Sequence, residues 1–134
     1  MKICRRETFN AAHRLFIPEW SDDKNFSVFG KCSNPNYHGH NYVLETWVEG
    51  KIDPKTGYVF DLGALKKIIR EKITDRFDHR NLNLDCSEFN GINPTAENIA
   101  LVIWTILRKE ISEEYQLTVR LYETENNVAE YSGN

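Results

Sequence analysis

The chain has few cysteines, no long apolar run and no excess of positive charge. Its three cysteines, Cys4, Cys32 and Cys86, are an odd and widely spaced set, so we expect no disulfide framework and a reducing compartment. No stretch approaches the ~18 consecutive apolar residues that span a bilayer, and the first ten residues lack the apolar centre of a signal peptide. The net charge of −3, without a basic stripe, argues against nucleic-acid binding. We therefore expect a cytoplasmic protein with neither a nucleic acid nor a membrane as partner.

The hydrophobic pattern predicts one α+β domain over residues 1–134. The composition, 40% hydrophobic and 28% charged, is that of a globular protein long enough to bury a core. Residues that alternate predict strands, and apolar residues at three- and four-residue steps predict helices. The resulting order, ββααββ, is typical of a four-stranded antiparallel sheet with two helices on one face. The predicted strands are 2–15, 38–51, 117–123 and 128–132, and the predicted helices are 62–76 and 95–111, with a long polar loop at 16–37 and a turn at 53–57.

Histidines cluster at the start of the second predicted strand, in "CSNPNYHGHNY" at 32–42. His38 and His40 are two residues apart, so on a strand their rings point to the same side. His13 lies on the corresponding face of the first strand, and three histidines with one open position are typical of a catalytic zinc site. Each histidine could instead make a local hydrogen bond, and Cys32 could close the site as a fourth ligand. The pattern favours a metal but leaves the role of Cys32 open.

Cys32 has surroundings unlike those of the other two cysteines. It follows Lys31 and precedes short polar residues, which predicts a lowered thiol pKa and a reactive thiolate. The alternative is a merely exposed or structural thiol.

A carboxylate and an imidazole are adjacent at Asp78 and His79, just after the first predicted helix. A carboxylate fixes the tautomer and orientation of a histidine in nucleophilic triads. A histidine near a helix C-terminus also interacts favourably with the helix dipole, and the spacing alone favours this simpler interpretation.

Glu123 has the same parity as Leu117, Val119 and Leu121, which places a carboxylate on the apolar face at the end of a strand. A buried carboxylate without a partner is strongly unfavourable, so such a group usually binds something, and a ligand with paired N–H donors would suit it. If the strand frays before residue 123, the side chain reaches water instead.

Six segments stand in order from about Phe9 to Tyr131: "FNAAHRL", "FGKCSNPNYHGHNY", "IDPKTGYVFDL", "FDHRNLNLD", "PTAEN" and "YETENN". Together they resemble the 6-pyruvoyl-tetrahydropterin synthase / 6-carboxytetrahydropterin synthase family. The resemblance implies zinc held by His13, His38 and His40. It also implies a catalytic thiol at Cys32 that acts with Asp78 and His79, and a pterin-anchoring carboxylate at Glu123 helped by Thr95.

The same resemblance implies the tunnelling fold (T-fold), in which trimers form a barrel and stack into a homo-hexamer with active sites between subunits. Glu123 and the zinc cluster would then lie on different chains around one substrate. That substrate is 7,8-dihydroneopterin triphosphate, from which triphosphate is eliminated. One branch of the family gives 6-pyruvoyl-tetrahydropterin for biopterin. The other loses acetaldehyde and gives 6-carboxytetrahydropterin for queuosine and related deazapurines.

The sequence features that bear on the product point in both directions. The six-residue step from Cys32 to His38 resembles pyruvoyl-forming members, but it also occurs in bacterial relatives of the carboxy branch, which "NPTAENIA" resembles more. We expect the carboxy product, with the pyruvoyl product as the alternative. Two other classes stay open: a non-catalytic zinc- and pterin-binding module, and a zinc hydrolase, which would leave Glu123 without a role.

Overall fold

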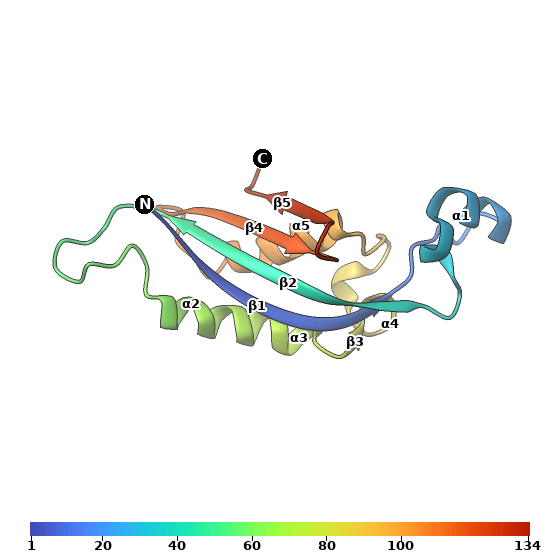
Figure 1. The fold of residues 1–134 in the computed structure, drawn as a ribbon, viewed down its shortest axis with the longest axis horizontal. Coiled ribbons are helices and arrows are strands. Elements are labelled where there is room, and N and C mark those ends of the chain that lie inside the picture. The colour runs from blue at the N-terminus through green and yellow to red at the C-terminus, as the bar shows by residue number, and fades with distance from the viewer.

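The computed structural model describes residues 1–134. Two twelve-residue strands run side by side for most of the length of the molecule, with helices along one face of the sheet (Figure 1). The strands are β1 (Lys2–His13), β2 (His38–Glu49), β3 (Arg80–Asn81), β4 (Gln116–Tyr122) and β5 (Val128–Tyr131), and the helices are α1 (Asp22–Phe29), α2 (Leu62–Ile69), α3 (Asp75–Phe77), α4 (Leu82–Asp85) and α5 (Ala96–Arg108).

The sheet has five strands in the order β3-β1-β2-β4-β5. The neighbours β1/β2, β2/β4 and β4/β5 pair antiparallel, whereas β3 pairs parallel to β1 at Ala11 and Ala12. The predicted α+β class with helices on one face is confirmed, but the four-stranded, purely antiparallel sheet and the simple order ββααββ are wrong. A two-residue strand is too short to show any alternation, so β3 has no pattern that a sequence reading can detect.

One face of the sheet and two helices enclose the core. Phe9 of β1 stacks on Tyr42 of β2 with ring centroids 5.0 Å apart, and Leu65 of α2 and Ile103 of α5 are fully buried against this face. The first turns of both helices are capped, α2 by Asp61 and α5 by Thr95. The result is a rigid platform whose apolar face continues to the ends of β1 and β2.

Two segments differ from their predicted form. The expected loop at 16–37 contains α1 and a 3₁₀ turn at Gly30–Ser33; α1 has no apolar stripe and is stabilised by its cap, Ser21, which accepts a hydrogen bond from the Lys24 N–H. The expected helix at 62–76 changes at Arg70–Thr74 to a π-helical turn before α3. The turn predicted at 53–57 is present. No helix has both the length and the apolar character needed to cross a bilayer.

Candidate active site

Three histidine rings meet where β1 ends and β2 begins. His13 is paired directly opposite His38 in the sheet, and His40 is opposite Ala11, so all three rings lie on the helix-covered face. One ring nitrogen of each histidine lies within 4.8 Å of the other two. Between the two histidines of β2, Gly39 passes close to β1, because a Cβ at that position would be 3.3 Å from the Ala11 carbonyl oxygen. The sequence alone predicted this grouping.

The hydrogen bonds of the cluster leave its nitrogens free to bind a metal. His13 donates its Nδ1–H to the Pro94 carbonyl over 2.7 Å, so its Nε2 carries a lone pair, which faces the Nε2 of His38 at 2.9 Å. The Nε2 of His40 is buried and makes no hydrogen bond. Two nitrogen ligands of one tetrahedral zinc lie roughly 3.3 Å apart, since each Zn–N bond is about 2.0–2.1 Å. An imidazole held through its other nitrogen by a carbonyl is typical of zinc ligands, and the donor set therefore fits zinc.

Burial keeps the His13 ring neutral at neutral pH. It lowers the pKa of His13 to about 4, an effect that the neighbouring rings of His38 and His40 strengthen and the hydrogen bond to Pro94 opposes. Burial also lowers the pKa of His38. A neutral imidazole is the form that binds a metal, so His13 is ready as a ligand at neutral pH.

The metal-free protein is expected to lose stability as the pH falls from 7.5 to 5. The His13 ring takes up its proton near pH 6.5 in the unfolded chain and at about 4 in the folded one. The unfolded state therefore binds more protons in this window, and the free energy of unfolding should fall by about 2 kcal/mol at pH 5. Urea unfolding of chelator-treated protein at both pH values measures this. Equal stability at pH 7.5 and 5 would show that the ring is not buried as described.

Glu123 lies directly beside the histidines. It follows β4, where its N–H donates to the Asn127 carbonyl over 3.1 Å, and its carboxylate oxygens are 4.0 Å from the Nε2 atoms of His13 and His40. Strand β4 ends at Tyr122, but the Glu123 side chain is only 18% exposed, so it does not extend into water as the alternative expected. One chain thus holds both groups, and the expectation that Glu123 and the histidines come from different chains is wrong.

A cavity of about 700 Å³ adjoins Glu123 on the α5 side and is also lined by Thr95. The Thr95 hydroxyl accepts a hydrogen bond from the Asn98 N–H over 3.2 Å as the cap of α5. Thr95 therefore has a structural role in addition to its position beside this cavity.

Cys32 lies in the 3₁₀ turn, outside the group of potential ligand atoms. Two contacts fix the turn to the end of β1: the Leu15 N–H donates to the Cys32 carbonyl over 2.9 Å, and the Arg14 Nε–H donates to the Ser33 carbonyl over 2.8 Å. Burial, and secondarily the negative charge of Glu123, raises the pKa of the Cys32 thiol. The lowered pKa expected from Lys31 is therefore wrong for the chain without a bound cation, because the Lys31 ammonium is exposed to solvent.

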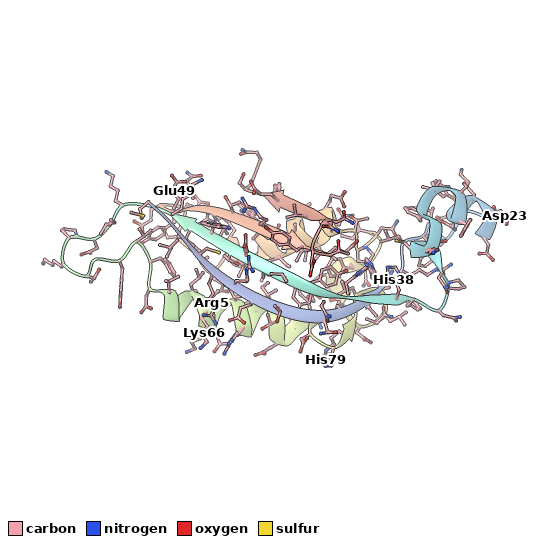
Figure 2. The ribbon with its side chains drawn as sticks, viewed as in Figure 1. Arg5, Asp23, His38, Glu49, Lys66 and His79 are labelled. Atoms are coloured by element: carbon pink, nitrogen blue, oxygen red, sulfur yellow. The ribbon has the colours of Figure 1, made fainter.

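Asp78 and His79 form the expected pair, but far from this cluster. The Asp78 carboxylate is 2.8 Å from the His79 Nδ1 and accepts the Asn10 N–H at 2.8 Å; the Asn10 contact is the main cause of the lowered pKa of Asp78. The His79 side chain is 80% exposed, and it projects outward beyond β1, away from His38 (Figure 2). No hydrogen bond or ion pair joins the pair to Cys32.

Two non-glycine residues have left-handed backbones, and both are next to candidate catalytic groups: His79 (φ 58°) and Tyr37 (φ 67°), which precedes His38. Such a conformation is unfavourable by about 1–2 kcal/mol for a residue with a Cβ. The sequence reading missed Tyr37, since no local pattern marks a tyrosine as left-handed.

Comparisons with known proteins agree on one group of enzymes. Residues 2–134 match the family model described as 6-pyruvoyl tetrahydropterin synthase. The chain is 46% identical over 132 residues to a 6-pyruvoyl tetrahydrobiopterin synthase of Pongo abelii and 44% identical over 132 residues to that of Homo sapiens, in each case over 98% of this chain and 91% of the relative. A solved 6-pyruvoyl tetrahydropterin synthase of Caenorhabditis elegans superposes with a TM-score of 0.92 at 38% identity, covering 100% of this chain and 96% of that one.

Proposed function

The chain belongs to the 6-pyruvoyl tetrahydropterin synthase family, and we propose that it converts 7,8-dihydroneopterin triphosphate to 6-pyruvoyl tetrahydropterin with release of triphosphate. It is a lyase of this type acting on a pterin, with zinc as its cofactor. The observation that carries the proposal is the cluster itself. Three imidazoles that can hold a metal lie beside Glu123, whose carboxylate oxygens are 4.0 Å from the nearest ring nitrogens, and a cavity adjoins that carboxylate.

The product proposed here differs from the one that the sequence favoured. The carboxy branch rested on "NPTAENIA", whereas the relatives 44–46% identical over nearly the whole chain are named 6-pyruvoyl tetrahydrobiopterin synthases. A whole-chain likeness outweighs one short segment. The pyruvoyl product is therefore the main proposal, and the carboxy product is the alternative.

His13, His38 and His40 would hold the zinc. When bound, zinc supplies Lewis-acid polarisation of oxygen atoms on the substrate. Because the three rings are fixed by two paired strands and by the Pro94 carbonyl, they would hold it in one place relative to Glu123.

The protein side chains divide the remaining chemistry among them. Glu123 would accept the paired N–H groups of the pterin ring in charge-assisted hydrogen bonds. Cys32 lines a cavity that it shares with His38 and His40, and as a general base its thiolate would take the proton from the substrate side chain. His79, oriented by Asp78 through the 2.8 Å contact, would move the second proton.

The last of these roles requires a second subunit. Asp78 and His79 are exposed at the edge of the sheet and make no contact with Cys32 in their own chain. An Asp78–His79 pair from a neighbouring copy would complete the site, in line with a homo-hexamer of two trimers.

Incubation of zinc-loaded protein with dihydroneopterin triphosphate tests the proposal. We expect release of triphosphate, measured by ion chromatography, with no acetaldehyde. Release of one acetaldehyde for each triphosphate would assign the carboxy product instead. No triphosphate release from zinc-loaded protein that still binds the pterin would leave a non-catalytic binding module, and cleavage of simple phosphate esters in its place would indicate a zinc hydrolase.

A further inference from the structure

A second cavity, of about 810 Å³, opens on the Cys32 side of the histidines. Two cations line it, Arg14 and Lys31, and neither has a carboxylate oxygen within 4.0 Å. The Arg14 guanidinium stacks on the Phe16 ring at 3.9 Å and donates one hydrogen bond within the chain, from its Nε–H to the Ser33 carbonyl. Its terminal nitrogens make no hydrogen bond, so they are free to bind an anion. Asp22 and Asp23, on α1, also line this cavity, and an anion is therefore expected at the Arg14 side.

His40 connects the cavity with Glu123. His40 lines the cavity and is also 4.0 Å from the Glu123 carboxylate. A ligand whose ring is held at Glu123 and whose chain passes the histidines would therefore extend its far end into the space beside Cys32. In a pterin triphosphate that far end is the phosphate chain.

Tyr37 also lines this cavity, and its backbone conformation is unusual for a tyrosine. Its backbone is left-handed, and its N–H donates to the Asn34 carbonyl over 3.0 Å. Glycine adopts this conformation without strain, so the tyrosine side chain is kept at a position that disfavours it. Its hydroxyl makes no hydrogen bond within the chain. Strained residues of this kind concentrate where ligands bind.

We propose that Tyr37 is a specificity-determining residue whose hydroxyl donates to the phosphate chain of the substrate, in a subsite where Arg14 and Lys31 supply positive charge. The inference rests on the proposed function for the identity of the anion. It gives Tyr37 a contact with substrate and no part in proton transfer.

Binding of inorganic tripolyphosphate to the zinc-loaded protein tests the subsite separately from turnover. In Tyr37→Phe we expect its dissociation constant, measured by calorimetry, to rise about tenfold, as for loss of a hydrogen bond to a charged group. The affinity for dihydroneopterin, which has no phosphate, should stay within about twofold. The KM for dihydroneopterin triphosphate should rise with the tripolyphosphate constant.

Two further variants complete the experiment. Tyr58→Phe changes an exposed tyrosine in the loop between β2 and α2, a loop at the opposite end of the molecule from α1 (Figure 1), and should alter neither constant. Tyr37→Gly should lose tripolyphosphate affinity at least as strongly while melting no lower than the parent, because glycine relieves the left-handed strain. Unchanged tripolyphosphate affinity in Tyr37→Phe, or a much lower melting temperature in Tyr37→Gly, would overturn the assignment. If the parent protein shows no turnover but Tyr37→Phe still weakens tripolyphosphate binding, the subsite is supported and the proposed function is rejected.

Discussion

Replacement of Cys32 with alanine is expected to lower triphosphate release about 10³-fold or more while zinc stays bound. A positioned general base contributes roughly 10²–10⁴ in rate. The two histidines that line the cavity with Cys32, His38 and His40, would be occupied as zinc ligands and could not replace the thiol as base. Zinc should remain because the Cys32 sulfur is outside the group of atoms that could hold the ion. Turnover by ion chromatography and zinc per chain by atomic emission are the two measurements.

The matched control for this variant is Cys4→Ala. Cys4 is a partly buried cysteine on β1, at the far end from the histidines, and its replacement should preserve both turnover and zinc. If Cys32→Ala loses its zinc, the thiol is a metal ligand. If it retains turnover, the base is another group.

Replacement of His13 with alanine is expected to remove both zinc and detectable turnover. The variant deletes one of three nitrogen ligands, and the loss of Lewis-acid stabilisation corresponds to several kcal/mol of the barrier. It also leaves the Pro94 carbonyl without its hydrogen bond, which should reduce the free energy of unfolding by about 1–3 kcal/mol. Zinc content, circular dichroism and urea unfolding of the same preparation separate these effects.

His79→Ala is the informative contrast to His13→Ala. The His79 ring is 80% exposed and hydrogen-bonds only to Asp78, so this variant should keep its zinc and its stability but lose turnover. A His13→Ala protein that binds zinc as the parent does would place the metal elsewhere on the chain.

The sequence predicted those features of the site that depend on local spacing, and it missed those that depend on residues far apart in the chain. The pairing of His13 with His38 and His40 was predictable, because strand parity assigns a face from spacing alone. The position of Glu123 was predictable for the same reason, as it continues the parity of β4. Its distance from the histidines was not, since that depends on the register between β2 and β4.

The errors have an equally physical origin. Strand β3 is set by the contacts of Asp78 and His79 with Asn10 across 68 and 69 residues of chain, and no local pattern encodes them. The thiol of Cys32 was judged by its neighbour Lys31 in sequence, although its pKa depends on burial and on Glu123, which is 91 residues away.

The short length of β3 has a consequence for the other residues of β1. Strand β3 covers β1 only at Ala11 and Ala12, so residues 2–9 have a partner strand on one side alone. The outer side of β5 is likewise unpaired. Each copy thus presents two rows of free backbone donors and acceptors, which in an isolated chain invite uncontrolled strand addition. A closed ring of copies, with the free row of one chain paired to that of the next, would satisfy both rows at once, and assembly would then protect the chain from aggregation as well as complete its site.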